Sequence, residues 1–546
     1  MKTISLAQLV EKPLLANWDN LAFSDFDGDD FTYGQLAENI KSLHLFFQFS
    51  GIKKGDKIAV VGRNSSRWGI TFLSVLTSGA VIVPVLPDFN VSDTNHILNH
   101  SEAKIVFVQK SLIDKIDLKK AERVETVIIL DNFTVHTSTD PDAATKLADA
   151  FAYYRKNASS VRDLGFYQWD REDCCIISYT SGTTGFTKGV MIPERSLVSN
   201  IVYAQENMPL LPDHKIVSFL PMAHVYGLLF EFIFPVTLGC HISFLAKTPS
   251  PQVITQAFGK IKPHLILSVP LIIEKIYKKR ILPTLEKPVM KIALAIPGIS
   301  GMILKKVREK LMETFGGRFF EIVIGGAPLS ADVEKFFKRI NFPITVGYGM
   351  TECGPLISYA AWNKTMPTSA GRMVDRMEMR IESEDPFNVV GEIQVKGENV
   401  MLGYYKNEQA TKEAFTEDGW LRTGDLGITD ANNFIFIRGR SKNMILGPSG
   451  QNIYPEEIEA KLCNLPYIAE CVVVDRNHKL VALVYPDFEA MKTDGVEESQ
   501  LNLIMKENLV KLNHELPKYE NVTEIQLVKE EFEKTPKKNI KRFKYM

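Results

Sequence analysis

The chain has few cysteines and no excess of charge of either sign. Its 546 residues include six cysteines and no C-x-x-C pair. Sparse, unclustered cysteines are typical of reduced thiols in a cytoplasmic protein, and they form no cysteine-based metal cluster. With 64 Lys and Arg against 65 Asp and Glu, the net charge is -1, which gives no electrostatic case for binding nucleic acid. Any basic site must therefore be local.

Long uninterrupted hydrophobic runs are also lacking. The chain starts with M-K-T-I-S-L-A-Q-L-V-E-K-P, where the apolar stretch is too short and too interrupted for a signal peptide. The most apolar segment, Gly227 to Ala246, is broken by Glu231, Pro235 and His241. We therefore expect it to be buried core or a pocket wall, and we expect no transmembrane helix.

Strand-like and helix-like stretches alternate through most of the chain. The run Asp56 to Gly62, an amphipathic stretch, and the run Ala80 to Val85 predict a strand, a helix and a second strand. Similar short apolar runs recur further on, and continuous apolar strands between helices indicate sheets that are covered on both faces. The sequence thus predicts an α/β fold with a large multilayered body, because the chain is too long for one ordinary core.

The pattern changes past about Arg438. A short strand and an R-G-R-S-K turn are followed by a helix start at Pro455, two apolar strands and a helix near Glu498 to His514. This is enough for a small α+β domain. We predict an N-terminal domain over residues 1–438 and a C-terminal domain over residues 439–546, joined near residues 438–442.

The stretch I-I-S-Y-T-S-G-T-T-G-F-T-K-G-V, Ile176 to Val190, predicts a strand that enters a phosphate-binding loop. Glycines let backbone N–H groups approach an anion, hydroxyls add donors, and lysine adds positive charge. It is not a Walker A loop, because Thr187 precedes Lys188 and a glycine follows it. The candidate phosphate ligands are Thr180, Ser181, Gly182, Thr183, Thr184, Gly185 and Lys188.

Three further motifs follow in a fixed order. They are V-G-Y-G-M-T-E-C-G-P (Val346 to Pro355), L-R-T-G-D-L-G (Leu421 to Gly427), and I-R-G-R-S-K-N-M-I followed by S-G-Q-N-I-Y-P-E-E-I-E (Ser449 to Glu459). With the phosphate loop, they make nearly the whole chain similar to the adenylate-forming superfamily, which contains acyl-CoA synthetases, luciferases and the adenylation domains of peptide synthetases.

The resemblance implies roles for individual residues. It places Tyr348 against adenine, with Gly349, Thr351 and Glu352 at phosphate and Mg2+, and it gives Tyr404 only a structural role. It implies that Asp425 holds the ribose hydroxyls, which suits the two acceptor oxygens of a carboxylate. Arg440 would reach ribose or phosphate, with an ordinary hinge salt bridge as the rival reading. Lys442 falls at the hinge about which the small mobile domain would rotate between two half-reactions.

The resemblance also implies the reaction. A carboxylate attacks ATP to give acyl-AMP and pyrophosphate, and the thiol of coenzyme A then displaces AMP. His224, in P-M-A-H-V-Y-G, would lie near the carboxylate, while Gly325, Gly326 and Ala327 would keep one wall of the acyl site low. The apolar segment suits an aliphatic tail, and the motifs look most like bacterial long-chain fatty acyl-CoA synthetases. We therefore expect a medium- to long-chain fatty acid.

Several alternatives stay open. The acid could be aryl or of another kind, the acceptor could be an acyl-carrier protein, and the chain could be a weakly active adenylate-binding module. A homodimer and a peripheral contact with a membrane also stay open.

The basic tail departs from the family pattern. Relatives end in a pattern like Pro-x-x-x-Lys-Ile/Leu-x-Arg, whose lysine enters the active site during adenylation. Aligning Ile540 and Arg542 with this pattern puts Asn539 at the lysine position. Either Lys538 takes over the catalytic role or the adenylation half-reaction is intrinsically slow, and Lys541 is a weaker candidate. Loss of a charged transition-state contact typically costs about 10^2 to 10^3 in rate.

Overall fold

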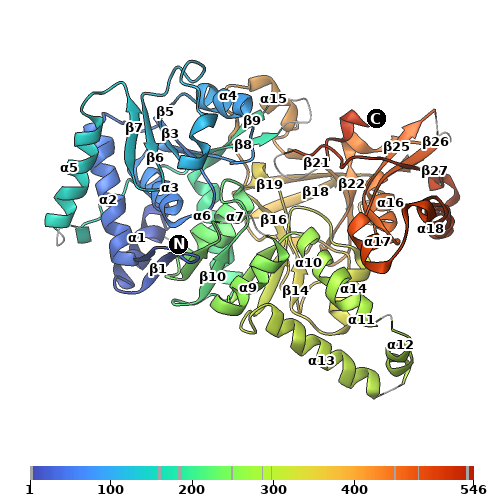
Figure 1. Cartoon of the computed structure of the whole chain (residues 1–546). Coiled ribbons are helices and arrows are strands. Elements are labelled where there is room, and N and C mark those ends of the chain that lie inside the picture. The colour runs from blue at the N-terminus through green and yellow to red at the C-terminus, as the bar shows by residue number, and fades with distance from the viewer. Residues whose placement is uncertain are drawn as a thin grey trace.

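The structure, a computed structural model, describes residues 4–157, 161–181, 187–246, 250–285, 287–296, 298–447, 451–477, 479–535 and 540–546. Its largest sheet has eight strands in the order β20-β9-β8-β4-β3-β5-β6-β7. They are β3 (Lys57–Val61), β4 (Val81–Val85), β5 (Ala103–Val108), β6 (Thr126–Ile129), β7 (Thr134–Ser138), β8 (Cys174–Ser181), β9 (Thr187–Pro193) and β20 (Gly403–Tyr404). Helices α2 (Tyr33–Phe49) and α5 (Ala143–Lys156) pack together on this part of the molecule (Figure 1).

The unit expected between Asp56 and Val85 is present. Strands β3 and β4 pair in parallel and are joined by α3 (Ser66–Ser78). Ser65 caps the first turn of α3 by accepting a hydrogen bond from a backbone amide. The helix ends at Gly79, whose φ of 90° favours glycine and whose absent Cβ leaves room for the ring of Tyr167, 2.9 Å from where that atom would stand. The predicted α/β fold class is confirmed.

Smaller sheets extend the body beyond the first sheet. One has the order β10-β11-β1-β2, and the others are β12-β13-β14, β15-β16-β17 and β18-β19-β21-β22. Their strands are β10 (Lys215–Ser218), β11 (His241–Phe244), β1 (Leu21–Asp25), β2 (Asp30–Thr32), β12 (Leu265–Ser268), β13 (Glu321–Ile324), β14 (Ile344–Val346), β15 (Tyr348–Gly349), β16 (Leu356–Tyr359), β17 (Arg372–Met373), β18 (Met377–Glu382), β19 (Gly391–Gly397), β21 (Leu421–Thr429) and β22 (Ile435–Arg440). Further helices of the body are α1 (Leu6–Ala16), α4 (Val91–Ser101), α6 (Glu194–Asn207), α9 (Pro251–Ile261), α10 (Pro270–Ile276) and α14 (Ala331–Arg339).

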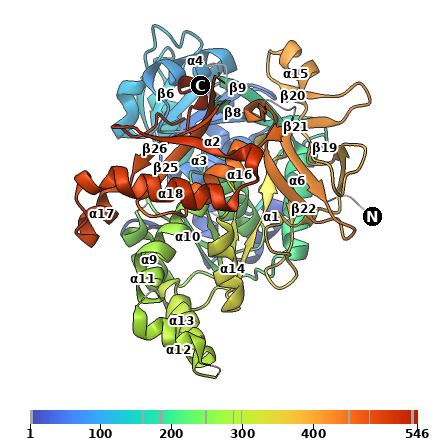
Figure 2. The same ribbon diagram turned by 90° about the vertical axis from the view of Figure 1, so that its right-hand side faces the viewer.

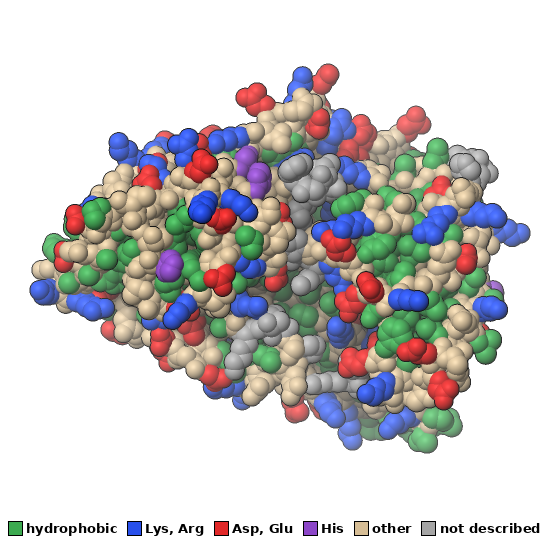
Figure 3. All heavy atoms as spheres, turned by 45° about the horizontal axis from the view of Figure 1, so that its top comes forward, with side chains coloured by type: hydrophobic (Ala, Val, Ile, Leu, Met, Phe, Trp, Pro, Cys, Tyr) green, Lys and Arg blue, Asp and Glu red, His purple; other side chains and the backbone are tan. Residues whose placement is uncertain are grey.

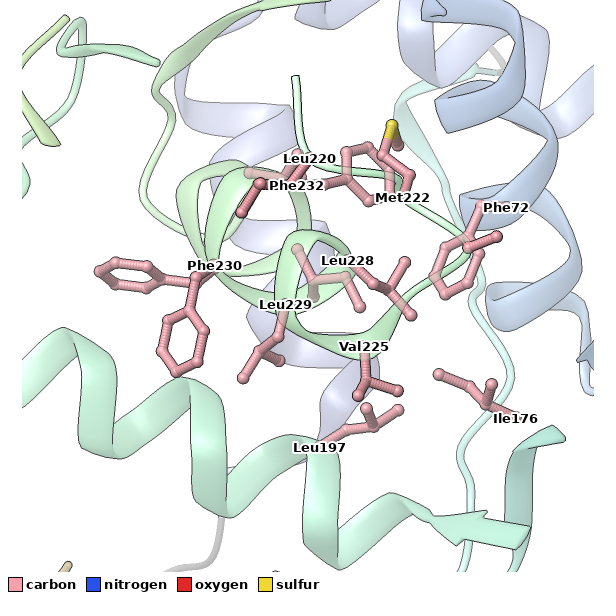
Figure 4. Close-up of a cluster of buried hydrophobic side chains, with 14 of the residues drawn as sticks. Phe72, Ile176, Leu197, Leu220, Met222, Val225, Leu228, Leu229, Phe230 and Phe232 are labelled. Carbon is pink, nitrogen blue, oxygen red and sulfur yellow. The ribbon is translucent and has the colours of Figure 1, made fainter. Parts of the chain in front are cut away.

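The most apolar segment of the chain is buried, as expected. It forms α7 (Val225–Gly227), a π-helix (Leu228–Ile233), α8 (Phe234–Val236) and β11. Its side chains pack in one cluster with Phe72 and Ile176 from neighbouring elements (Figure 4). Glu231 is fully buried within it and accepts hydrogen bonds of 2.9 Å from the amides of Phe219 and Leu220. The one acidic group is therefore held by backbone donors, which offsets part of the cost of its burial.

Two helices project from the body as an arm, α12 (Pro288–Ala295) and α13 (Ile299–Thr314) (Figures 1 and 2). The chain is bent by 119° between them. Among the described residues, no single helix is long and apolar enough to cross a membrane. This bent pair passes the same test on length and composition taken together.

The C-terminal part has its own sheet and its own core. The sheet has the order β25-β26-β27, formed by β25 (Ile468–Arg476), β26 (Lys479–Pro486) and β27 (Val522–Leu527). Helices α16 (Pro455–Leu462), α17 (Phe488–Asp494) and α18 (Leu501–Glu515) belong to this part (Figures 1 and 2). The buried residues of the main core end at Ile435, and those of the second core begin at Ile453. The two cores lie on either side of residues 438–442 and are compatible with a domain boundary there. The boundary itself stays a prediction.

The face drawn in Figure 3 carries charged side chains of both signs. Figure 3 shows basic and acidic side chains interspersed on the face that it presents. This agrees with the net charge of -1. All six cysteines are free thiols.

Candidate active site

Asp425 is buried at the centre of a group of polar side chains. It lies in β21, opposite Arg440 of β22, and is 4% exposed. Its Oδ2 accepts a hydrogen bond of 2.7 Å from the hydroxyl of Tyr348, and its Oδ1 lies 2.8 Å from Nε of Arg440. Strand pairing brings Asp425 and Arg440 together, and a side-chain hydrogen bond adds Tyr348, so three residues that the motifs assign to the nucleotide site meet here.

Burial and pairing act in opposite directions on this carboxylate. Burial raises the pKa of the Asp425 carboxyl, while the guanidinium of Arg440 and the hydroxyl of Tyr348 act to lower it. The sequence left open whether Arg440 contacts the nucleotide or forms a salt bridge. The structure shows that Arg440 forms a salt bridge with Asp425. Each carboxylate oxygen has two lone pairs, so Asp425 keeps acceptor capacity for two vicinal hydroxyls.

A second set of contacts links Lys188 to Glu352 through Tyr404. The ammonium of Lys188 lies 4.8 Å from the centroid of the Tyr404 ring, and the Tyr404 hydroxyl donates a 2.9 Å hydrogen bond to Oε1 of Glu352. Burial raises the pKa of Tyr404, so its hydroxyl stays a donor at neutral pH. The sequence assigned Tyr404 only a structural role. The structure places it between the predicted phosphate and metal residues, and Tyr404 lies outside the motifs, so no motif separated it from a core aromatic.

The predicted phosphate loop connects β8 to β9. These strands pair antiparallel, with Thr180 opposite Lys188 and Ser181 opposite Thr187. The pairing of β20 with β9 brings Tyr404 to the same edge. The other candidates of this loop, Gly182, Thr183, Thr184 and Gly185, lie outside the described residues. The described hairpin fixes where the loop starts and ends, next to the Lys188 side chain.

Close backbone packing positions Glu352. Gly349 in β15 pairs with β16, and a Cβ there would stand 2.2 Å from the carbonyl oxygen of Pro355. Only glycine fits that approach. Thr351 is buried at 5% exposure, and the amide of Met401 donates a 2.8 Å hydrogen bond to the Glu352 carbonyl. The backbone that carries Glu352 is therefore held on both sides.

His224 lies at the start of the buried apolar segment. It is half-buried, and its Nδ1 accepts a 3.4 Å hydrogen bond from the amide of Tyr226. The ring of Tyr226 fills the space beside Gly325, where a Cβ would stand 2.9 Å from it. The missing side chain of Gly325 thus makes room for Tyr226, whereas Gly326 and Ala327 are exposed.

Lys442 is exposed in a one-turn 3-10 helix between the two cores. Next to it, Nδ2 of Asn443 donates a 2.6 Å hydrogen bond to Oε1 of Glu456. A separate contact joins the two parts, from Nζ of Lys278 to the carbonyl of Cys463 at 2.7 Å. The hydroxyl of Ser330 also donates a 2.8 Å hydrogen bond to Oδ1 of Asn464, so the named contacts across the junction are polar. The hinge role of Lys442 itself stays a prediction.

The described basic side chains of the tail are paired inside the C-terminal part. Nη1 of Arg542 lies 2.6 and 2.7 Å from the two oxygens of Glu459. Lys541 and Lys544 both pair with Glu533. Burial raises the pKa of Glu459 to about 7, and the guanidinium acts in the opposite direction. The tail is therefore fastened to its own domain and does not form a free basic patch over its described length.

Lys538 and Asn539 lie outside the described residues. The described chain on either side of them is held by an isolated bridge between Lys534 and Ile540. Lys534 also lies 2.5 Å from Oε1 of Glu470. Which residue replaces the family lysine is therefore still a prediction from the sequence.

Two family models match the chain in order. The model described as AMP-binding enzyme matches residues 12–405, and the model described as AMP-binding enzyme C-terminal domain matches residues 442–546. The chain belongs to the AMP-binding enzyme family. The resemblance that the motifs indicated is confirmed, and the family places the chain among AMP-forming acid–coenzyme A ligases.

Relatives in this family cover most of the chain. It is 30% identical over 489 residues, 85% of this chain and 78% of the other, to long-chain-fatty-acid–CoA ligase FadD15 of Mycobacterium bovis. It is 26% identical over 545 residues, 86% of this chain and 74% of the other, to the chloroplastic long-chain-fatty-acid–[acyl-carrier-protein] ligase AEE15 of Arabidopsis thaliana. The solved structure of ATP-bound MatB from Rhodopseudomonas palustris matches with a TM-score of 0.77 at 23% identity, over 99% of this chain and 98% of that one. That likeness supports the fold of this family.

Proposed function

We propose that this protein joins a medium- to long-chain fatty acid to coenzyme A at the expense of ATP. A carboxylate oxygen of the acid attacks the α-phosphorus of ATP, which forms acyl-AMP and releases pyrophosphate. The thiolate sulfur of coenzyme A then attacks the acyl carbon, and AMP leaves with the bonding electron pair. The observation that carries this proposal is the convergence of Tyr348, Asp425 and Arg440 in a chain of this family. We propose a cytoplasmic location for the reaction.

The described side chains can position the nucleotide. Asp425 supplies acceptors for the ribose hydroxyls, and Lys188 supplies positive charge at the edge where the phosphate loop starts. Catalysis of this kind rests on positioning and on charge stabilisation of the transferring group, with no need for a nucleophilic side chain. Such a mechanism fits a site built from one aspartate, two cations and tyrosine hydroxyls.

The residues also fit a magnesium ion that arrives with the nucleotide. Among the described residues, no group of three or more His, Cys, Asp or Glu side chains could hold a metal by itself. Mg2+ is usually bound through one or two carboxylates together with substrate phosphates, and Glu352 offers one such carboxylate. When bound, the ion supplies positive charge to the phosphate oxygens.

Two observations support a fatty acid as the substrate. The π-helix that follows His224 is buried throughout, and it is apolar apart from Glu231, whose carboxylate accepts hydrogen bonds from backbone amides. The relatives from Mycobacterium bovis and Arabidopsis thaliana are both named for long-chain fatty acids. Because one of them is named for an acyl-carrier protein, that acceptor is the second candidate.

A pyrophosphate-release assay with a panel of acids tests the proposal. We expect release with medium- and long-chain fatty acids, and acyl-CoA when coenzyme A is present. Preference for an aryl acid would contradict the substrate. Release with no acyl-CoA, but with acylation of a phosphopantetheinylated carrier, would identify the second acceptor. Absence of release with every acid, together with ATP binding, would identify a binding module.

A further inference from the structure

The arm formed by α12 and α13 exposes large apolar side chains at its tip. Five of them lie within fourteen residues and are well exposed: Val289 (79%), Ile292 (66%), Ile296 (43%), Ile299 (39%) and Met302 (63%). A contiguous apolar patch on the surface marks an interaction site more often than chance. Both views show the arm standing away from the body (Figures 1 and 2).

The arm is attached through its opposite side. Leu304 and Val307 of α13 are partly buried against the main core. Further along the same helix, Leu311 is buried at 5% exposure. The apolar tip is thus presented by a helix whose base is packed, and the described part of the chain does not cover it.

Positive charge surrounds the tip. Between residues 287 and 314 the sequence has six basic residues, Lys287, Lys291, Lys305, Lys306, Arg308 and Lys310, against two acidic ones, Glu309 and Glu313. All five lysines are exposed. Those of α13 follow Met302 by three to eight residues, which at about 1.5 Å per residue puts them roughly 5 to 12 Å behind the apolar tip.

We propose that this arm docks the protein on the surface of an anionic lipid bilayer. The apolar tip enters the boundary between headgroups and acyl chains, a depth of about 5 to 10 Å, and the lysines behind it lie at the level of the acidic headgroups. At about 1.5 Å per residue, neither helix spans a hydrocarbon core of about 30 Å, so the arm lies in the interface. A second copy of the chain is a poorer occupant, because facing arms would bring lysines of like charge together.

Flotation of the full-length protein with vesicles tests this proposal. One set of vesicles is phosphatidylcholine alone, and the other is an equal mixture of phosphatidylcholine and phosphatidylglycerol. We expect much stronger binding to the mixture and loss of that binding at high salt. Lys305→Gln and Lys306→Gln should each weaken binding to the mixture about fivefold and leave the weak binding to phosphatidylcholine unchanged.

The apolar tip is tested by Val289→Asn combined with Ile292→Asn, which should lower binding to the mixed vesicles at least tenfold, an order-of-magnitude figure from the area removed. The control is Val510→Asn, which changes an equally exposed valine (71%) on α18, and it should bind like the native protein. Because all three side chains are exposed, these variants should keep the native melting temperature.

A depth measurement separates insertion from simple charge attraction. The fluorescence of Ile292→Trp should be quenched by brominated acyl chains, and that of Val510→Trp should not. The proposal fails if the native protein does not float with the mixed vesicles, or if the double asparagine variant floats as well as the native protein. It also fails if the arm variants abolish a concentration-dependent dimer or a complex with a protein partner while vesicle binding is absent.

Discussion

The body and the C-terminal part contribute to the proposed active site in different ways. In the body, the pairing of β21 with β22 and a tyrosine from β15 hold Asp425 in a buried, hydrogen-bonded position. In the C-terminal part, the described tail is fastened by Arg542 to Glu459 of its own domain. The body thus holds the residues of the proposed nucleotide site in place, while the second part is held together by its own contacts, and in our proposal it brings its residues to that site. Changes in the body should affect both half-reactions, and changes in the tail should affect one.

Asp425→Ala should show the largest effect and should damage both half-reactions. It removes the acceptor for the ribose and leaves Arg440 without its partner. Two charge-assisted hydrogen bonds are worth about 1.5 to 3 kcal/mol each, so we expect a loss of about 10^3 in kcat/KM. The control is Asp418→Ala, which removes an exposed aspartate that also pairs with an arginine. If Asp425→Ala slows only one of the two half-reactions, the body does not serve both of them as proposed.

Asn539→Lys should act on adenylation alone. A lysine at this position would restore the charged contact of the relatives, so acyl-AMP formation should rise by about 10^2 to 10^3. The reaction of preformed acyl-AMP with coenzyme A should stay nearly unchanged. Single-turnover measurements of both steps check this. If the rate stays flat and Lys538→Ala abolishes pyrophosphate release, Lys538 is the working residue.

Arg542→Met should destabilise the C-terminal part without unfolding the body. It leaves the buried carboxylate of Glu459 without its cation, which costs about 3 kcal/mol. Hydrogen exchange should therefore speed up in β25 and α16 and stay unchanged in the eight-stranded sheet. Lys544→Met is the matched control, because its partner Glu533 is exposed and such pairs contribute less than about 1 kcal/mol. Equal loss of protection in both parts would show that they unfold together.

The stability of the body should carry its own pH dependence through Glu321. Burial raises the pKa of this carboxyl to about 7, although it accepts hydrogen bonds from the Tyr359 hydroxyl and the Trp362 amide. Because the folded pKa lies above the unfolded value of about 4.3, the contribution is present at low pH and is lost as the pH rises toward about 7. The native protein should lose about 2 to 3 kcal/mol relative to Glu321→Gln between about pH 5 and about pH 8. If the melting temperatures of the native protein and of Glu321→Gln change by the same amount over this pH range, Glu321 does not carry this pH dependence.

Tyr404→Phe should have the smallest effect. It removes the hydrogen bond to Glu352 and keeps the ring beside Lys188, so adenylation should slow about fivefold, as expected for one hydrogen bond of about 1 kcal/mol. Tyr405→Phe is the control, because its hydroxyl bonds to Glu102 on the surface. If the two variants catalyse adenylation at equal rates, the Tyr404 hydroxyl has no role in the active site.

The sequence predicted those parts of the site that lie within motifs. Tyr348, Asp425 and Arg440 each stand in a long motif, and the structure brings these three together. The contacts of Tyr404 with Lys188 and Glu352 could not be predicted, because they depend on the pairing of β20 with β9, a contact between segments far apart in the chain. Spacing within one segment carries no signal for such a contact.

Burial of the apolar segments could be predicted only in part. The segment from Gly227 to Ala246 and the segment from Pro288 to Met302 are both rich in large apolar residues. The first is buried by neighbouring helices and strands, and the second lies on an arm that the described body leaves open. Composition alone predicts burial for both segments, and only the tertiary structure shows that one is buried and the other exposed.

The proposed activity is the activation of fatty acids with ATP and their transfer to coenzyme A. The most direct test measures pyrophosphate and acyl-CoA in the same reaction, with the native full-length protein and fatty acids of increasing chain length. Both products should form in equal amounts with medium- and long-chain acids, and Asp425→Ala should lose both. Binding of ATP with neither product formed, by the native protein and by Asn539→Lys alike, would contradict the proposal.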